Sequence, residues 1–257
     1  MTPSERLATA EPEEPFAAAA ARLAGFDQAP VLDGARPIGI LRLAAGELAG
    51  RTVRESMNAV TEADSLRTDT PIADSIERLA RHDCLLVFNT HAAPQLAGLL
   101  HFADLNKHAV RTYCYLWLAA LELALAQLVR EHCRSVEDWI AHLDERSQVQ
   151  VLGRYEFQRR QSVHVDHLEG VELTDLLRIV ERCEPLRSVL GFGSPTAFQK
   201  VAAPLASLRH DAMHPVRSMI RGHNDVPRLA RRLADLRALV ATAHGGRLRD
   251  RLTGAAN

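Results

Sequence analysis

An internal repeat in the first half of the 257-residue chain limits its fold more than any other feature of the sequence. The repeat is offset by 56 positions over most of its length and by 59 in its last part, where Gly39-Ile40-Leu41 matches Gly98-Leu99-Leu100. Self-similarity at a fixed spacing indicates two copies of one structural unit. At a shift of 56 positions, Pro15, Ala17, Arg22, Leu23, Ala24, Asp27 and Val31 fall on Pro71, Ala73, Arg78, Leu79, Ala80, Asp83 and Val87.

Each copy has the same order of predicted elements: helix, strand, polar turn, strand and helix. A proline precedes the first helix, where its missing N–H has no cost. The first helix and first strand are expected at 16–23 and 29–32 in one copy, and at 72–80 and 84–88 in the other. The second strand begins at Gly39 or Gly98. The pattern predicts an α+β module over residues 1–108, with copies at about 4–50 and 51–108.

The segment Gly98-Leu99-Leu100-His101-Phe102-Ala103-Asp104 matches, at both ends, the Gly-apolar-apolar-Thr/Ser-x-x-Asp signature of CBS domains. With this order of elements, the stretch from about Ser4 to Val110 resembles a tandem CBS pair, or Bateman module. The resemblance implies a regulatory ligand that contains adenosine, such as AMP, ATP or S-adenosylmethionine. It places Asp104 at the ribose hydroxyls of that ligand and Thr68 or Thr70 near its base.

The two copies depart differently from the CBS signature. His101 stands where a Thr or Ser is usual, and the first copy has Arg42 and Ala45 at the positions of the hydroxyl and the carboxylate. One nucleotide site is therefore expected in the module. His101 or Arg42 could contact ligand phosphates by charge-assisted hydrogen bonds. The alternative is a pair of copies that serves as a dimerisation platform without a ligand.

From about residue 109 the strand pattern gives way to helical periodicity. Helices are expected at 108–133, 135–143, 146–161, 172–190 with an interruption near Pro185, 195–220 and 226–244. Pro204 and Pro215 lie within the helix expected at 195–220 and should kink it. Antiparallel helices with short links predict an all-α bundle over residues 109–250 and a flexible tail at 251–257.

Residues 113–129 are apolar apart from Glu122 and Gln127. This stretch is shorter than the roughly 20 residues of a membrane span, so we expect a buried helix of the bundle. The four cysteines form no Cys-x-x-Cys and lie in apolar stretches, which is typical of reduced thiols. Because the start of the sequence has no apolar signal core, a cytoplasmic protein is expected.

Arg209 and His214 lie five positions apart in the helix expected at 195–220, and we expect them on one helical face. A permanent cation beside a group that exchanges protons near neutral pH suits cleavage of a phosphodiester without a metal. Residues 195–257 contain 11 Lys/Arg and 4 Asp/Glu, a net charge of +7. This excess favours a polyanionic partner.

Together with His210 and Pro215, these residues resemble the ribonuclease motif of HEPN domains (higher eukaryotes and prokaryotes nucleotide-binding), in which Arg, then Asn, Asp or His, then three residues, then His is often followed by Pro. The resemblance implies an RNA substrate, no cofactor for catalysis, and a homodimer that brings two Arg/His sets to one cleft. His214 would transfer protons, Arg209 would hold the phosphate, and His210 would orient the pair or contact phosphate. The RNA backbone could be bound by Arg217, Arg221, Arg228, Arg231 and Arg232.

Two functions are consistent with these features. The first is a ligand-regulated, metal-independent endoribonuclease of the toxin or defence-effector type, with an HEPN-like bundle and a CBS pair that senses an adenine nucleotide. The alternative is a non-catalytic nucleotide-binding regulatory or dimerisation protein. In that case Arg209 and His214 bond to neighbouring carbonyls or carboxylates, and the other arginines form a solvated helix face.

Overall fold

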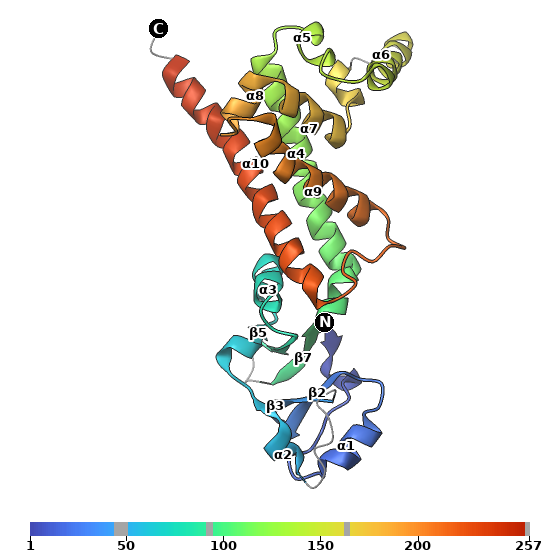
Figure 1. Cartoon of the computed structure of the whole chain (residues 1–257), viewed down its shortest axis with the longest axis vertical. Coiled ribbons are helices and arrows are strands. Elements are labelled where there is room, and N and C mark those ends of the chain that lie inside the picture. Colours follow the sequence, from blue (N-terminus) through green and yellow to red (C-terminus); the bar gives the residue numbers. More distant parts are fainter. Residues whose placement is uncertain (44–50, 91–94, 162–164, 255–257) are drawn as a thin grey trace. The chain divides into compact units, whose positions relative to one another are not determined.

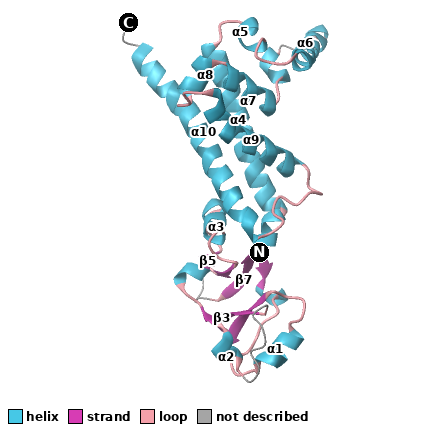
Figure 2. Cartoon of the chain, viewed as in Figure 1, coloured by secondary structure: helices cyan, strands magenta, loops and turns pink. Residues whose placement is uncertain are grey.

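The structure is a computed structural model that describes residues 1–43, 51–90, 95–161 and 165–254, with side chains described as far as residue 245 (Figure 1). Ala45, where the first copy departs from the CBS carboxylate, lies outside the described residues. The chain divides into two compact units. The first comprises Met1–Lys107 and Ile220–Ala230, and the second comprises His108–Met219 and Arg231–Asn257. The strands of the described residues belong to the first unit, and the second is helical (Figure 2).

Both copies of the first unit have the predicted first helix and two strands. The first copy contains α1 (Phe16–Arg22), β2 (Gln28–Asp33) and β3 (Arg36–Arg42), and α2 (Val53–Ser56), which lies beyond its expected end at about residue 50, packs on it. The second contains α3 (Ile72–Leu79), β6 (Cys84–Phe88), β7 (Leu96–His101) and the 3-10 helix η3 (Phe102–Asn106). Helix α3 buries Ala73, Ile76 and Leu79, three residues apart, so one stripe of the helix faces the core.

A two-residue strand that precedes the first helix of each copy pairs with the other copy. Strand β1 (Thr2–Pro3) pairs with β7 of the second copy, and β4 (Asn58–Ala59), 56 positions later, pairs with β3 of the first. The resulting sheets have the strand orders β2-β3-β4 and β1-β7-β6-β5, where β5 is Ser65–Arg67. A parallel pairing of Ala10 with Val31 is matched, at the same shift, by Leu66 with Val87. The repeat in the sequence is thus a repeat in strand pairing.

Gly39 and Gly98 were predicted to begin the last strand of each copy, but they lie inside β3 and β7, where an exchanged strand passes. Gly39 pairs with Ala59 of β4, and Gly98 pairs with Pro3 of β1. A Cβ atom on Gly39 would meet the side chain of Met57, and one on Gly98 would meet the backbone carbonyl oxygen of Thr2. Glycine is therefore needed at both positions because another backbone approaches closely.

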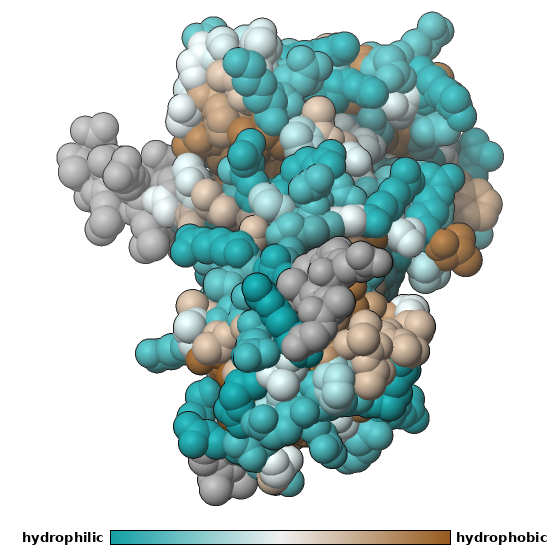
Figure 3. Space-filling model, turned by 60° about the horizontal axis from the view of Figure 1, so that its bottom comes forward, coloured by the Kyte–Doolittle hydropathy of each residue, from teal (hydrophilic) through white to brown (hydrophobic). Residues whose placement is uncertain are grey.

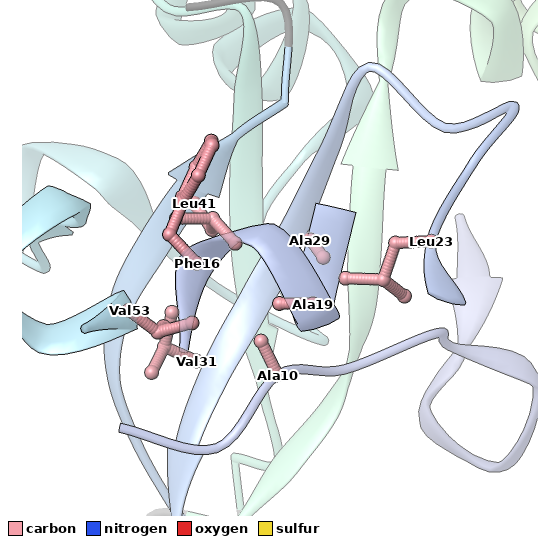
Figure 4. Packing of buried hydrophobic residues seen from close by; sticks show 8 residues of the cluster. All are labelled: Ala10, Phe16, Ala19, Leu23, Ala29, Val31, Leu41 and Val53. Atoms are coloured by element: carbon pink, nitrogen blue, oxygen red, sulfur yellow. The ribbon is translucent and has the colours of Figure 1, made fainter. Parts of the chain in front are cut away.

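Two hydrophobic clusters hold the first unit together. One lies inside the first copy and is formed by Ala10, Phe16, Ala19, Leu23, Ala29, Val31, Leu41 and Val53 (Figure 4). In the other, Ile40 of the first copy packs with Cys84, Leu86, Leu96 and Leu99 of the second. Ile40 and Leu41 are neighbours on β3 and point to opposite faces of the sheet. One strand therefore contributes to the core of its own copy and to the core that joins the copies.

The second unit is built around α4 (His108–His132), which packs against α7, α8 and α9. The other helices of this unit are α5 (Val136–Ile140), α6 (Glu145–Arg160), η4 (His167–Gly170), α7 (Leu173–Arg182), α8 (Glu184–Val189) and α9 (Pro195–Met213). Helix α10 (Val226–Gly254) begins in the first unit and continues in the second. A short 3-10 helix, η5 (His223–Asp225), precedes it.

The helix predicted at 195–220 is wrong at its C-terminal end. Helix α9 ends at Met213, and His214 is its C-cap residue with φ −108° and ψ 87°. A proline disfavours the helical conformation of the residue before it, so Pro215 ends the helix at this point instead of kinking it. Pro204, in contrast, lies inside α9. Of the tail predicted at 251–257, residues 251–254 belong to α10, and 255–257 lie outside the described residues.

Among the described residues, α4 is the one helix whose length and composition would allow it to cross a membrane. Of its apolar 18-residue window, 44% is buried inside the protein. Cys114, Leu121 and Leu125 are fully buried, so α4 packs as the core helix of the second unit. On the face of the molecule shown in Figure 3, hydrophilic side chains predominate and apolar ones form small groups.

Candidate functional site

Two clefts lie where the copies of the first unit meet. The His101 cleft has a volume of about 230 Å³ and is lined by Thr2, Arg6, Leu7, Ala8, Gly25, Phe26, Asp27, Gln28, Pro30, Leu99 and His101. The Arg42 cleft has a volume of about 110 Å³ and is lined by Gln28, Ile40, Arg42, Asn58, Ala59, Asp64, Arg81, His82, Asp83 and Cys84. The repeat relates the two, since Asp27 corresponds to Asp83 and Phe26 to His82. Each cleft combines residues of both copies.

His101 ends β7 and caps η3, and its Nδ1 accepts a hydrogen bond of 3.4 Å from the N–H of Ala103. Its ring lies against that of Phe102, with the ring centres 4.0 Å apart. Burial lowers the pKa of His101, although the carboxylates of Asp104 and Asp27 oppose this change. The neutral ring is thus favoured in the folded protein, and the predicted phosphate contact would have to come from a neutral N–H donor or from a ring that ligand binding protonates.

Asp104 is buried, and its carboxylate is already engaged. One oxygen accepts a hydrogen bond of 2.9 Å from the N–H of His101, and the other lies 2.5 Å from Nζ of Lys107 and 3.3 Å from the amino group of Met1. Burial acts to raise the pKa of Asp104, but the Lys107 and His101 hydrogen bonds hold it below its ordinary value. Asp104 does not line the His101 cleft, and its contacts are those of a helix-capping residue.

Thr68 and Thr70 lie at the other end of the sheet from His101. In the strand register, Arg67 is opposite Phe88, whereas His101 is opposite Cys84 at the start of the same strand, β6. The hydroxyl of Thr70 accepts from the N–H of Arg67 at 3.0 Å, and that of Thr68 bonds to the Thr90 hydroxyl at 3.0 Å. The structure therefore does not bring these threonines together with Asp104.

The charged residues that line the Arg42 cleft are paired with one another. Arg42 forms an ion pair of 2.7 Å with Asp83, and His82 lies 3.1 Å from Asp64. Burial raises the pKa of the Cys84 thiol to about 12, so this cysteine is a protonated core residue and not a nucleophile. The cations and anions that line this cleft neutralise one another.

In the second unit, two histidines of the Arg/His motif come together on the surface. His210 and His214 are exposed, and their ring centres are 4.3 Å apart. Nη1 of Arg217 lies 2.6 Å from Nε2 of His210, which therefore accepts its hydrogen bond. Two imidazoles and one guanidinium thus form an exposed cluster at the end of α9.

Arg209 has different neighbours, so the expectation that it shares one helical face with His214 is wrong. Its guanidinium lies 3.6 Å from the carboxylate of Glu172 and is half-buried. Burial raises the pKa of Glu122 on α4, while the nearby charge of Arg209 opposes this effect. Because α9 ends at Met213, His214 leaves the helix and approaches His210 instead.

Sequence reasoning missed Arg111, which holds this region in place. Arg111 is buried on α4 and donates to the carbonyl oxygens of Asp211 at 2.7 Å, His214 at 3.4 Å and Arg217. The last carbonyls of a helix have no partner within the helix, and an arginine can satisfy them. The signal in the sequence is a charged residue beside Val110 and Cys114, just before a stretch, 113–129, that is apolar apart from Glu122 and Gln127.

The other arginines predicted to bind RNA belong to different units. Arg221 and Arg228 lie in the first unit, whereas Arg217, Arg231 and Arg232 lie in the second. Arg228 forms an ion pair of 2.5 Å with Asp225, whose carboxylate also accepts from the N–H of Arg221. Arg231 is exposed and Arg232 is half-buried. Their binding of RNA stays a prediction.

No known family profile and no curated protein match the sequence. Solved structures of CBS proteins do resemble the chain. They include the CBS-pair protein CBSX2 from Arabidopsis thaliana (19% identity, 44% of this chain and 92% of that chain, TM-score 0.38) and the same protein in complex with AMP (20%, 44% and 94%, 0.38). A third is the CBS domain of a bacterial CNNM/CorC family Mg²⁺ transporter in complex with ATP (19%, 40% and 79%, 0.35). At such TM-scores the likeness adds no argument to the repeat and the strand pairing, which carry the resemblance of the first unit to a tandem CBS pair.

Proposed function

We propose that the first unit is a nucleotide-sensing module that binds an adenine nucleotide in the His101 cleft. An adenosine ligand is what the CBS resemblance of the sequence implies. The observation that supports this cleft is its lining, which combines an exposed aromatic ring, a carboxylate, an arginine and a histidine. Phe26 is 54% exposed, and it lines the cleft together with Asp27, Arg6 and His101.

Each of these groups suits one part of a nucleotide. The ring of Phe26 can stack on adenine, and Asp27 can accept hydrogen bonds from ribose hydroxyls. Arg6 can hold phosphate oxygens by a forked pair of hydrogen bonds. In this proposal Asp27 takes the ribose role that the resemblance implies for Asp104. Since ligand pockets commonly measure roughly 300–1,000 Å³, a cleft of about 230 Å³ would enclose the base and ribose and leave the phosphates at its mouth.

Calorimetry with AMP, ATP and S-adenosylmethionine tests this proposal. Loss of one stacking contact costs about 1–3 kcal/mol, so Phe26→Ala should weaken binding by at least about fivefold. His82→Ala is the matched control, because His82 occupies the corresponding position of the Arg42 cleft. Equal affinities for Phe26→Ala and the wild type, or loss of binding in His82→Ala alone, would remove the His101 cleft from consideration.

We propose RNA cleavage without a metal as a second function, at the cluster of His210, His214 and Arg217 with Arg209 nearby in sequence. The supporting observation is the pair of exposed histidine rings at 4.3 Å. One imidazole would take the proton of a ribose 2′-hydroxyl, whose oxygen attacks the phosphorus. The other, protonated, would give its proton to the leaving 5′-oxygen, which yields a 2′,3′-cyclic phosphate and a 5′-hydroxyl. Arg217 or Arg209 would stabilise the charge on the phosphate.

The cleavage assay uses single-stranded RNA in EDTA, with and without AMP. His210→Ala and His214→Ala should each lower the rate by at least about 100-fold, because general acid–base catalysis contributes that much or more. Arg209→Ala and Arg217→Ala identify the arginine that stabilises the charge on the phosphate, whose loss should cost about 100-fold or more. His244→Ala is a control in the same unit. Nucleotide binding without RNA turnover would favour the alternative, a regulatory protein with no catalytic activity of its own.

The HEPN resemblance also implies a homodimer, and we propose one for this chain. Mixing the inactive His210→Ala and His214→Ala variants tests whether the dimer completes the site. If both histidines of one site come from one chain, the mixture stays inactive. If the site combines residues of two chains, the mixture regains part of the activity, and a monomer in sedimentation measurements would contradict the proposal.

A further inference from the structure

A third cavity in the first unit lies away from the two clefts. The Arg78 pocket has a volume of about 540 Å³, and Leu66, Arg67, Thr70, Arg78, Phe88 and Asn89 contribute to its lining. It is located where the parallel strands β5 and β6 end, since Arg67 lies opposite Phe88. His101 pairs with Cys84 at the other end of β6, so this pocket is separate from the His101 cleft.

In the corresponding region of the first copy, a carboxylate neutralises the equivalent arginine. Arg22, which corresponds to Arg78, binds Glu14 through Nε at 3.3 Å and Nη2 at 2.7 Å. It also donates to the carbonyl oxygen of Thr9 at 3.0 Å, just as Arg78 donates to the carbonyl oxygen of Ser65 at 2.7 Å. The two arginines are therefore held in the same way by the backbone.

The second copy lacks the carboxylate. The position of Glu14 is occupied by Thr70, and the backbone there is equivalent, because the N–H of residue 70 bonds to the carbonyl of Arg67 as that of Glu14 bonds to Glu11. Within the described parts of the chain, neither Arg67 nor Arg78 forms an ion pair. Arg78 therefore has the same backbone hydrogen bond as Arg22 but no carboxylate partner among the described residues.

At a second position the charge has opposite signs in the two copies. Arg67 corresponds to Glu11 at the shift of 56 positions. At the three positions considered, the first copy carries one net negative charge and the second carries two net positive charges. Glu62 also lines the pocket and leaves it with one net positive charge. Arg67 is itself anchored, since its Nη2 donates to the carbonyl oxygen of Thr90 at 2.5 Å.

We infer that the Arg78 pocket binds a phosphomonoester of a small organic molecule. Two guanidinium groups fixed by backbone carbonyls have further N–H groups with which to hold phosphate oxygens, and little side-chain freedom remains to be lost on binding. Leu66 is buried and Phe88 is half-buried, and they offer an apolar wall to the organic part. A volume of about 540 Å³ lies within the usual range of small-molecule sites. This inference does not depend on the proposed function of either unit.

The repeat itself supplies the most direct test. Thr70→Glu restores to the second copy the carboxylate that neutralises Arg22 in the first, so it should close the pocket by pairing with Arg78. Phenyl phosphate, titrated into the full-length chain by calorimetry, should bind the wild type at least tenfold more tightly than Thr70→Glu. Thr70→Gln has the same length without the charge and should retain binding within about threefold.

Arg78→Gln gives an independent measurement and should also weaken phenyl phosphate at least tenfold, with thermal unfolding checked for each variant. Phenol, which lacks the phosphate, should not bind measurably. The inference is overturned if Thr70→Glu and Arg78→Gln, both folded, bind phenyl phosphate as the wild type does, or if Thr70→Gln loses as much as Thr70→Glu. Phe26→Ala should leave phenyl phosphate binding unchanged, and a loss in that variant would place the ligand in the His101 cleft instead.

Discussion

The two copies of the first unit have one framework and different chemistry. In both, a proline precedes the first helix, and a glycine lies where a strand from the other copy passes. A parallel pairing between backbone segments also recurs at a shift of 56 positions. The side chains that face the cavities differ: Arg42 corresponds to His101, and the Arg22–Glu14 pair corresponds to Arg78 beside Thr70. The strand pairing is therefore repeated, while several of the residues that line the cavities differ between the copies.

Replacement of the strand glycines should give the largest difference between the copies. In Gly98→Ala the new methyl group meets the backbone carbonyl of Thr2, whereas in Gly39→Ala it meets the side chain of Met57, which can adopt another rotamer. Overpacking commonly costs about 1–3 kcal/mol, and we expect Gly98→Ala in that range and Gly39→Ala below it. Urea unfolding followed by circular dichroism measures both, and an equal or reversed order would show that the two strand crossings are not as different as the structure indicates.

The paired arginines should show a smaller difference. Arg22→Ala removes a two-pronged ion pair whose arginine is exposed to solvent, so the loss of unfolding free energy should be at most about 1 kcal/mol. Arg78→Ala should lose less, because this residue binds a backbone carbonyl and no carboxylate among the described residues. Salt should reduce the cost of Arg22→Ala and leave that of Arg78→Ala nearly unchanged. Thermal unfolding at low and high ionic strength distinguishes the two outcomes.

The smallest expected effect is the change in stability with pH that His101, in the second copy, contributes. Because burial lowers the pKa of His101 from its ordinary value of 6.5, the folded state favours the neutral ring. Its contribution to stability is present above pH 6.5 and is lost as the pH falls through the lowered pKa. Between pH 7 and pH 5 the wild type should therefore lose more unfolding free energy than His101→Gln. Arg42→Gln should follow the wild type, since an arginine does not titrate in this range.

The elements that repeat were predictable from the sequence, and the contacts between them were not. Seven identical residues at one spacing predicted the helix and strand order of both copies. Strands β1 and β4 have two residues each, which is too short to produce an alternating pattern, so their exchange could not be foreseen. Asp104 matches the CBS signature by spacing, but the contact with Lys107 that occupies it depends on how η3 turns.

The helical unit shows the same limit. The Arg/His motif was found from four residues within positions 209–215, yet the partner of Arg209 is Glu172, which is 37 positions away in the sequence. Pro215 was read as a kink, although its effect on the residue before it ends α9 and moves His214 beside His210. Arg111 acts through carbonyl groups, which every residue has, and a single sequence therefore contains no mark of its partners.

The strand exchange also determines when the first unit can fold during synthesis. Thr2 pairs with Leu99, about 100 positions later, and the sheet of the first copy is completed by residues 58–59. Contacts so distant in sequence close slowly, because a long loop must be ordered before they form. The sheet of the first copy can therefore be completed once residue 59 has been synthesised, whereas that of the second copy must bind a strand made about 100 positions earlier. A chain interrupted between them would leave an open edge on each sheet, where other strands could add.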